Sequence, residues 1–387
     1  MDAMRGTGVE AVRQVLADFD PELPLSRART LPKEWYTWEA VAELERAVVF
    51  GQTWQAVGRR ELVAEAGSYV TFDVGGEPVV VVRGEDGVLR GFINVCRHKA
   101  ARVCTAEQGR ASKLRCRYHG WTYDLTGRLR GVPEFAGVEE FDREANGLPE
   151  VAVAEWGPYV WVHLGQPAVD LESYLRPLPQ WVAERQAFQG LVWHERRVYD
   201  VACNWKVYVD NYLDGGYHVN TVHPGLSEAL QYKDYRTLCD GQTVLQVSPL
   251  QPAEGAVGRT RSGDLAAYWW VYPNVMFNIY PGVMDCNIVV PLGVERCRVL
   301  FDLYFAEGTP PDFIAESLAV TEQVQREDME VCEEVQRNLH SRSYRFGRFS
   351  VERENGGYYF HQLVGRAVQA AAGVTPRRDS AGEGSRP

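Results

Sequence analysis

The sequence lacks several features that would define other classes of protein. No apolar run approaches the roughly 18 residues that cross a membrane, and the opening MDAMRGTGVEAVRQVLADFD carries acids and lacks the apolar stretch of a signal peptide. Lysine and arginine number 41 against 52 aspartates and glutamates, and this net charge of −11 disfavours nucleic acid or an anionic membrane as the main partner. We therefore expect a cytoplasmic protein that binds neither nucleic acid nor membrane.

Cysteine and nucleotide-binding motifs are also scarce. Eight cysteines in 387 residues are too few for a disulfide scaffold, so free thiols or metal ligands are the better expectation. The sequences GGEP and GEDG indicate turns and do not match the dinucleotide fingerprint G-x-G-x-x-G. Chemistry that depends on NAD(P)H would therefore need a separate reductase.

The patterns that are present predict an α+β protein. Residues 34–60 repeat apolar positions every three or four residues, as an amphipathic helix does. Short alternating runs between turn residues follow, and further along strands alternate with helices around 205–220 and 312–340. We predict an N-terminal helical segment, a small all-β domain, a larger domain of helices and antiparallel sheet, and a disordered tail, at residues 1–50, 51–165, 166–365 and 366–387 respectively.

Two short motifs in the predicted β domain contain paired cysteines and histidines. Cys96 and His98 form C-x-H, and after 17 further residues Cys116 and His119 form C-x-x-H. Zinc could bind such a set, but zinc sites usually pair cysteine with cysteine and histidine with histidine along the chain. The mixed pairing favours a [2Fe–2S] cluster in which one iron takes two thiolates and the other takes two imidazoles.

The motifs CRH and CRYHGW resemble the signature of the Rieske family, including Gly120 and Trp121 after the last ligand. The family often has proline where this chain has Arg117, and we expect the additional charge to alter the reduction potential or docking and not the ligation. Cys104 lies between the two motifs without a paired histidine, which predicts a small buried residue.

A second group of candidate ligands lies in the segment NWKVYVDNYLDGGYHVNTVH. On a continuous helix Asp210, Asp214 and His218 would share one face, at i, i+4 and i+8, whereas His223 would need a bend to reach the same point. Two histidines and one carboxylate make the facial triad of a non-haem Fe(II) oxygenase, which leaves positions open for O₂. The segment therefore requires a carboxylate from elsewhere.

The best candidate for that carboxylate is Asp328, in the predicted helix ESLAVTEQVQREDMEVCEEVQRNL. It falls within the apolar stripe that indicates the buried face, namely Val324, Val331, Val335 and Leu339. A carboxylate there is costly unless it is paired or binds a metal. The flanking acids, Glu327, Glu330, Glu333 and Glu334, are predicted to form a solvated face. Alone, Asp328 is better explained as a buried aspartate held by arginine or backbone donors, but beside the histidine pair the ligand interpretation is favoured.

The order of these motifs resembles the large (alpha) subunits of Rieske non-haem iron oxygenases. The stretches CNWKVYVDNYLDGGYH, WVYPNVMFNIY and MDCNIVVPLG resemble the choline monooxygenases, and the similarity runs from about Trp35 to His361. The resemblance implies a helix-grip-like catalytic domain in which His218, His223 and Asp328 bind a mononuclear iron.

The resemblance also implies a role for a neighbouring acid. Asp214 would correspond to the acid that bridges this iron to a Rieske histidine of a neighbouring subunit. In many relatives that acid lies three residues before the first histidine, where this chain has Gly215, whereas Asp214 lies four before it. Asn211 and Asp210 are candidates to support the iron ligands, and the alternatives for both are helix capping or surface solvation.

An enzyme of this family uses O₂, a Rieske cluster, mononuclear Fe(II) and electrons from a separate reductase, with or without a ferredoxin. Family members are usually homotrimers, because one subunit's cluster serves the iron of the next. Three functions follow, in order of preference. They are hydroxylation of choline or a related quaternary amine, dioxygenation of an aromatic ring by a large subunit, and electron transfer by a Rieske carrier.

Aromatic side chains would recognise a quaternary ammonium group, which binds best against their faces. The candidates for such a cage are Tyr212, Tyr217, Trp269, Trp270, Tyr272 and Tyr280. Each could instead be an ordinary core residue of a strand, and the negative net charge only weakly favours a cationic substrate.

Overall fold

The computed structural model describes residues 8–377 and separates the chain into two compact units. The small unit comprises Phe50–Tyr174, and the large unit comprises Met1–Val49 together with Leu175–Pro387. The N-terminal segment, which the sequence suggested as a separate part, thus belongs to the large unit. The α+β class is confirmed, because both units contain antiparallel sheet and the large unit adds long helices.

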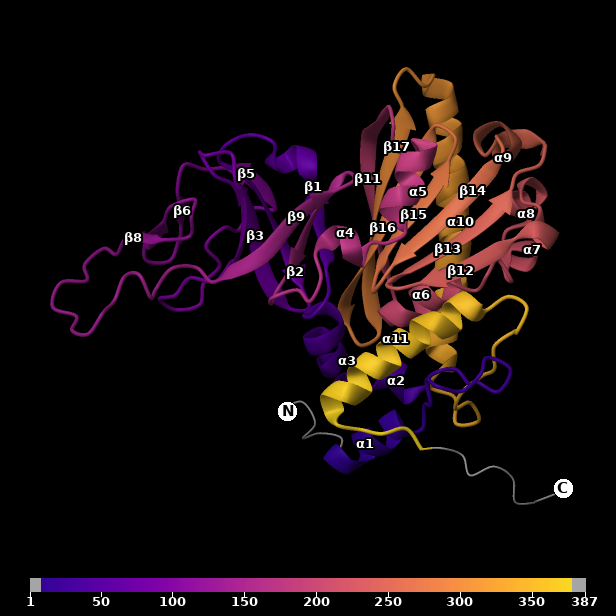
Figure 1. The fold of residues 1–387 in the computed structure, drawn as a ribbon, viewed down its shortest axis with the longest axis horizontal. Helices are drawn as coiled ribbons and strands as arrows, with labels where there is room; N and C mark the ends of the chain where they lie inside the picture. The colour runs from indigo at the N-terminus through magenta and orange to yellow at the C-terminus, as the bar shows by residue number, and fades with distance from the viewer. Residues whose placement is uncertain (1–7, 378–387) are drawn as a thin grey trace. The chain divides into compact units, whose positions relative to one another are not determined.

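Antiparallel sheet forms most of the small unit (Figure 1). One sheet has the strand order β1-β10-β9-β4-β3-β2-β5, and a smaller one has the order β6-β7-β8. The strands are β1 (Gln55–Arg59), β2 (Ser68–Val74), β3 (Glu77–Arg83), β4 (Leu89–Ile93), β5 (Gln108–Arg110), β6 (Leu114–Arg115), β7 (Thr122–Tyr123), β8 (Leu129–Gly131), β9 (Glu150–Trp156) and β10 (Tyr159–His163). A 3₁₀ turn (Arg60–Val63) and the short helix α4 (Leu171–Tyr174) complete the unit.

Strand β3 has an apolar core on each of its faces. Successive side chains of a strand point to opposite faces, and Val79–Val82 are all buried. Val80 and Val82 pack in a core with Cys96, Cys116 and their neighbours, whereas Val79 and Val81 pack in a second core. Burial on both faces explains why the sequence of β3 is continuously apolar. One of these faces packs in the same core as the two cysteines.

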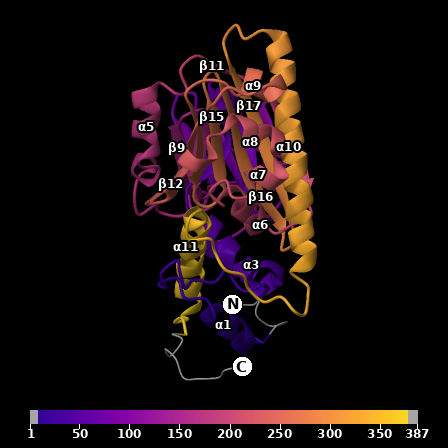
Figure 2. The same ribbon diagram turned by 90° about the vertical axis from the view of Figure 1, so that its right-hand side faces the viewer.

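The large unit is organised around one seven-stranded antiparallel sheet with the order β11-β17-β16-β15-β14-β13-β12. Its strands are β11 (Leu191–Val201), β12 (Arg236–Asp240), β13 (Thr243–Pro249), β14 (Leu265–Val271), β15 (Val275–Tyr280), β16 (Val283–Gly293) and β17 (Arg296–Ala306). Figure 2 shows α5 (Leu178–Arg185) and the long helix α10 (Pro311–Asn338) on opposite sides of this sheet. The sheet therefore has a helix against each face.

Shorter helices complete the large unit. They are α1 (Val9–Ala17), α2 (Glu34–Thr37), α3 (Glu39–Glu45), α6 (Trp205–Tyr212), α7 (Val219–Val222), α8 (Pro224–Ala229), α9 (Gly255–Thr260) and α11 (Asn355–Ala372), with a 3₁₀ turn at Tyr232–Asp234 and a π-helical turn, Arg46–Phe50, where the units meet in sequence. In the part of the chain that the structure describes, none of the helices combines the length and the apolar character that crossing a bilayer requires.

Three local predictions need correction. The helical pattern of residues 34–60 breaks into α2, α3 and a π-helical turn, and β1 already begins at Gln55. The tail predicted from residue 366 begins too early, because α11 continues to Ala372, while residues 378–387 lie outside the described residues. The predicted buried stripe of α10 is wrong at Val335, which is 43% exposed. The fully buried positions near it are instead polar or small: Gln325, Cys332 and Gln336.

Candidate functional site

Two equivalent loops of the small unit carry the four predicted cluster ligands. In the first loop, Cys96 N donates to Ala101 O at 2.8 Å and Ala100 N donates to Cys96 O at 3.0 Å. The second loop, which begins at Cys116, repeats both hydrogen bonds with Gly120 in the place of Ala100. Both of these residues have positive φ, 57° and 73°, a conformation that glycine adopts most readily. The loops therefore share one backbone geometry, built from related sequences.

The loops place two thiols inside the unit and two imidazoles nearer its surface. Cys96 and Cys116 are buried, His98 is half-buried and His119 is exposed. The two imidazole centroids lie 4.6 Å apart, and the indole of Trp121 stacks on His98 at 4.9 Å. His98 Nδ1 is buried without a hydrogen-bond partner in the described residues, as is expected of a nitrogen that binds a metal. This donor set fits a [2Fe–2S] cluster.

Tyr123, which the sequence did not single out, contacts the first loop. Its hydroxyl oxygen accepts a hydrogen bond from Arg97 N at 3.0 Å and lies 3.5 Å from Cys96 Sγ. Because the amide donates to that oxygen, the hydroxyl proton is available to the sulfur. Hydrogen bonds to the sulfurs help to set the reduction potential of a cluster. Nothing in the sequence marked this residue, since it lies outside the ligand motif.

The two histidines of the large unit are positioned by a turn between short helices. The sequence predicted one helix over about 205–220, but α6 ends at Tyr212, and Gly215 then has a φ of 69°. A Cβ atom at Gly215 would clash with Arg353 O, so a side chain has no room there. His218 and His223 flank the single turn of α7. This turn supplies the bend that the five-residue spacing required.

His218, His223 and Asp328 come together as predicted. Among the described residues, this is the one group of three such side chains whose possible ligand atoms all lie close enough to share a metal ion. The two Nε2 atoms are 3.1 Å apart, and Asp328 Oδ1 lies 3.0 Å from His223 Nε2 and 3.6 Å from His218 Nε2. Ligands at about 2.1 Å and at right angles around one ion lie roughly 3 Å apart. The three side chains therefore fit one face of a mononuclear iron.

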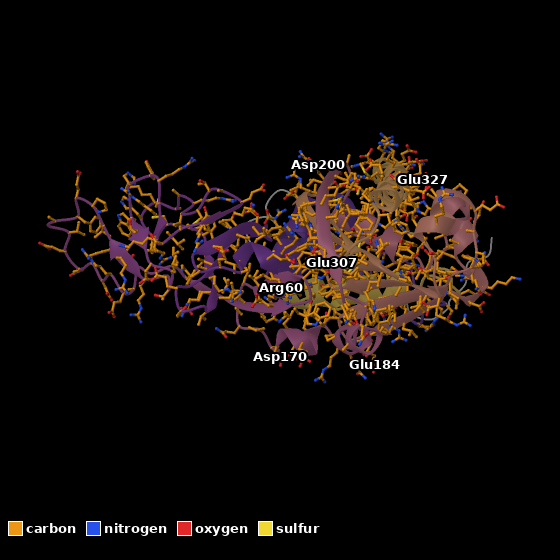
Figure 3. The ribbon with its side chains drawn as sticks, turned by 90° about the horizontal axis from the view of Figure 1, so that it is seen from above. Arg60, Asp170, Glu184, Asp200, Glu307 and Glu327 are labelled. Carbon is orange, nitrogen blue, oxygen red and sulfur yellow. The ribbon has the colours of Figure 1, made fainter. Side chains whose placement is uncertain are left out.

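Each of these histidines also contacts a carboxylate through its other ring nitrogen. His218 Nδ1 lies 2.5 Å from Asp214 Oδ2, and His223 Nδ1 lies 2.6 Å from Glu327 Oε2. Such pairing holds the proton on Nδ1 and leaves the Nε2 lone pair for a metal. Burial lowers the pKa of His223, but the carboxylates of Asp328 and Glu327 outweigh burial and raise it. Glu327, predicted as solvated, thus lies beside the site on α10 (Figure 3).

Asn211 and Asp210 lie on α6 but serve different neighbours. Asn211 Nδ2 donates to Asp328 Oδ1 at 2.7 Å and orients that carboxylate. Asp210 instead accepts from Tyr36 OH at 2.8 Å and lies 2.6 Å from His361 Nε2. Asp210 thus links α6 to α2 and α11, away from the three converging ligands.

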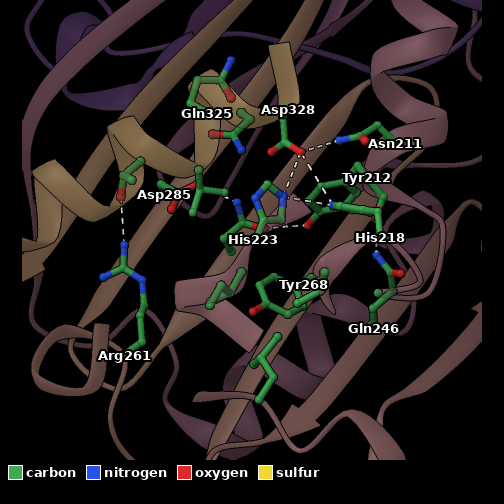
Figure 4. Close-up of a pocket in the computed structure, with 18 of the residues that line it drawn as sticks. Asn211, Tyr212, His218, His223, Gln246, Arg261, Tyr268, Asp285, Gln325 and Asp328 are labelled. Carbon is green, nitrogen blue, oxygen red and sulfur yellow. Dashed lines mark hydrogen bonds and ion pairs between the residues drawn. The ribbon is translucent and has the colours of Figure 1, made fainter. Parts of the chain in front are cut away.

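A cavity of about 120 Å³ opens beside these ligands, and Figure 4 shows its walls. One wall is a row of side chains across four strands, because Gln246 pairs with Tyr268, Tyr268 with Asn278, and Asn278 with Asp285. Asn278 Nδ2 donates to Asp285 at 2.7 Å. Burial raises the pKa of Asp285 to about 6, although Asn278 and the charge of Arg261 act in the opposite direction.

Only two of the six aromatic residues predicted for a substrate cage line this cavity, namely Tyr212 and Tyr280. Tyr217 is 55% exposed, and the other three are buried elsewhere in the large unit. Trp269 points to the opposite face of β14 from Tyr268 and packs on Trp181 of α5, and Trp270 packs on Tyr272 and Phe360. The tyrosines that line the cavity are Tyr208, Tyr212, Tyr235, Tyr268 and Tyr280.

Arg261 and Asp285 also line the cavity, and the sequence predicted neither. Asp285 had a detectable signal, because it is the one charged residue of MDCNIVVPLG, a stretch that is mostly apolar. Arg261 lies in the polar stretch GRTRSGD, where an arginine is unremarkable, so no signal marked it.

The family models agree with these two sites. The model of the Rieske [2Fe-2S] domain matches residues 53–142, and the model of the ring hydroxylating alpha subunit (catalytic domain) matches residues 188–370. The chloroplastic choline monooxygenase of Arabidopsis thaliana is 37% identical over 92% of this chain and 87% of its own length. The chain belongs to the Rieske oxygenases. The predicted family and enzyme class are thereby confirmed, and the two matched domains imply a Rieske cluster and a non-haem iron.

Two solved structures extend the comparison for this oxygenase. The first is a quaternary ammonium Rieske monooxygenase whose structure was related to carnitine oxidation and inter-subunit electron transfer. It has a TM-score of 0.81 and 29% sequence identity, and the match covers 91% of this chain and 98% of that one. Naphthalene 1,2-dioxygenase from Rhodococcus sp. has a TM-score of 0.73 over 88% of this chain and 94% of its own, but only 20% identity, and so shares the fold.

Proposed function

We propose that this oxygenase is a monooxygenase that hydroxylates choline or a related quaternary amine. In this proposal the cluster ligands are Cys96, His98, Cys116 and His119, and the iron ligands are His218, His223 and Asp328. When bound, the cluster supplies single electrons and the iron supplies open positions at which O₂ is activated. The electrons come from a separate reductase, directly or through a ferredoxin.

The observation that carries the proposal is the composition of the cavity beside the iron ligands. Five tyrosines line it, together with the buried carboxylate of Asp285. A quaternary ammonium ion is attracted to aromatic faces and to negative charge, and it cannot form a hydrogen bond. The relatives named for choline and for quaternary ammonium substrates support the same class.

Several residues prepare the site without binding iron themselves. Asp214 and Glu327 hold the protons of the two histidines on Nδ1, and Asn211 orients Asp328. We assign Asp214 a second role as the bridging acid toward a cluster histidine of a neighbouring subunit. In this assignment the active form is a homotrimer.

Dioxygenation of an aromatic hydrocarbon is less well supported. The buried charges of Arg261 and Asp285 would have to lose solvent against an apolar ring that offers neither of them an opposite charge. An electron carrier would leave the converging triad and its cavity without a use.

Nitric oxide, an O₂ surrogate, tests the proposal on the reduced, iron-loaded protein. Electron paramagnetic resonance of the ferrous–NO adduct would be recorded with and without choline, γ-butyrobetaine or naphthalene. We expect the ferrous–NO signal to change when choline or γ-butyrobetaine is added and to stay the same when naphthalene is added. The variant His218→Ala should lose the signal and keep the colour of the cluster. No signal from the unsubstituted protein would exclude the mononuclear iron, and a response to naphthalene alone would favour the dioxygenase.

A further inference from the structure

The cavity beside the iron ligands contains two opposite charges that the metal site does not use. Arg261 and Asp285 both line it, and each is only 4% exposed. In Figure 4 they lie on one side of His223, with His218 and Asn211 on the other. Within the described residues, neither forms an ion pair closer than 4.0 Å with any charged group. Two buried, unpaired charges in one cavity require an explanation, because burial of an unpaired charge is costly.

Arg261 is held so that part of its guanidinium remains available. Its Nη1 donates to Thr260 O at 3.0 Å and to Ser317 Oγ at 2.7 Å, and its Nη2 donates to Thr321 Oγ1 at 2.8 Å. The guanidinium also lies over the Tyr280 ring, 4.9 Å from the centroid. Of the five N–H donors, the Nε–H and one Nη2–H form no hydrogen bond within 3.5 Å in the described residues, and the guanidinium also interacts with the Tyr280 hydroxyl. These two neighbouring donors form the fork that a carboxylate accepts in a bidentate pair.

Asp285 is fixed by neutral groups. It accepts from Asn278, whose own oxygen accepts from Tyr212 OH at 2.9 Å. Asn287, on the same strand and also lining the cavity, has a buried Oδ1 without a partner in the described residues. The Asp285 end of the cavity therefore offers the charge of Asp285, the partial negative charge of Asn287 Oδ1 and the ring of Tyr212, all of which attract an organic cation.

We propose that this cavity selects a zwitterion that carries both a quaternary ammonium group and a carboxylate. The Arg261 Nε and Nη2 donors bind the carboxylate, and Asp285 with the cavity tyrosines receives the ammonium. The inference rests on the proposed function and narrows its substrate class. Choline has no anionic group, so it would leave Arg261 unpaired and would be the poorer ligand.

Calorimetric titration of the full-length protein with both metals bound tests this inference without a substitution. The ligands are γ-butyrobetaine, its methyl ester and choline, because the ester keeps the ammonium and removes only the negative charge. We expect the acid to bind at least tenfold more tightly than the ester or choline. Equal affinities would overturn the inference and leave the proposed function standing. If no quaternary amine bound at all, the proposed function and the inference would both be wrong.

Substitutions then assign the preference to residues. The variant Arg261→Gln should lose the tenfold preference for the acid, while Arg259→Gln should keep it. Arg259 is the matched control, because it lies on α9 but points outward and pairs with Glu316. A preference that persists in Arg261→Gln would overturn the role of Arg261.

A second substitution tests Asp285. The variant Asp285→Asn should weaken the binding of γ-butyrobetaine and leave unchanged the binding of its carbon analogue, 5,5-dimethylhexanoate. Equal weakening of both would overturn the role of Asp285.

Discussion

At the scale of single residues, the proposed iron site depends on groups outside its set of ligands. Each of the two proposed histidine ligands presents Nε2 because a carboxylate holds its Nδ1 proton, Asp214 for His218 and Glu327 for His223. Outer partners of this kind orient the ligand and increase its basicity. Removing one should therefore weaken the metal site without removing a ligand.

We expect Glu327→Ala to lower the affinity of the mononuclear site for Fe(II) by about 10- to 100-fold, the range typical of lost outer partners. The measurement is competition for iron against a chelator, with the absorbance of the cluster as an internal reference. Glu330→Ala is the control, because Glu330 is an exposed acid on the same helix. Unchanged affinity in Glu327→Ala would mean that His223 is oriented by packing alone.

Tyr123 provides the corresponding test at the cluster. We expect Tyr123→Phe to lower the reduction potential by tens of millivolts, because the hydroxyl proton near Cys96 Sγ stabilises the more negative, reduced cluster. A hydrogen bond worth about 1 kcal/mol corresponds to roughly 40 mV for one electron. Redox titration followed by visible absorbance gives the value. An unchanged potential would show that the hydroxyl serves only the Arg97 amide.

At the scale of elements, the central sheet decides which side chains reach the cavity. Strand register places the row from Gln246 to Asp285 on one face, and alternation places Trp269 on the other. Helix α6 is fixed separately, because the buried Lys206 ammonium lies 2.7 Å from the buried Glu45 carboxylate of α3. The N-terminal segment thus helps to hold the helix that carries Asn211, which contacts Asp328.

Asp285 should destabilise the sheet that carries it. Its folded pKa of about 6 lies above the usual carboxyl value of 3.8. The folded protein therefore binds a proton more tightly than the unfolded chain, and stability falls as pH rises from about 4 to about 6. The difference of about two pKa units, at about 1.4 kcal/mol per unit, predicts that Asp285→Asn raises the free energy of unfolding by about 3 kcal/mol at pH 8.

Denaturant unfolding of the metal-loaded protein and of the variant at pH 4 and pH 8 measures this effect. We expect the two proteins to differ most at pH 8 and much less at pH 4, where the folded carboxyl is protonated and the unfolded one is only about half ionised. A variant less stable than the unsubstituted protein at pH 8 would contradict the prediction. It would mean that the attraction of Arg261 exceeds the effect of burial.

At the scale of the whole molecule, one chain carries both a cluster site and an iron site, in separate compact units. We propose that electrons pass between subunits, with Asp214 as the bridging acid. Its carboxylate contacts His218 and the amides of Tyr217 and His218, and 14% of its side chain remains exposed.

We expect Asp214→Asn to retain both metals, because an amide oxygen still accepts from His218 Nδ1, and to lose nearly all turnover. Single-turnover experiments separate this from a general defect. A reduced cluster mixed with O₂ and substrate should be reoxidised at least 100-fold more slowly in the variant. Reoxidation at the normal rate would exclude the bridging role.

The local sequence was enough to predict the features whose residues lie close together or follow a period. The ligand pairs of Cys96 and Cys116 lie within four residues, and His218 and His223 are five apart, so spacing alone indicated metal chemistry. Asp328 was identified because a carboxylate interrupts a helical stripe, although Val335 in that stripe is exposed. These inferences rest on chemistry that short segments carry themselves.

Features that depend on strand register and on helix contacts became visible only in the folded chain. Tyr268 and Trp269 are adjacent aromatic residues of β14, yet only Tyr268 lines the cavity. Successive side chains of a strand point to opposite faces of the sheet. Glu327 and Glu330 are both acids of one helix, and only the position of His223 distinguishes them. Arg261 and Asp285 meet in one cavity from distant segments. Contacts between such segments are set by the packing of the whole unit, and no local pattern encodes them.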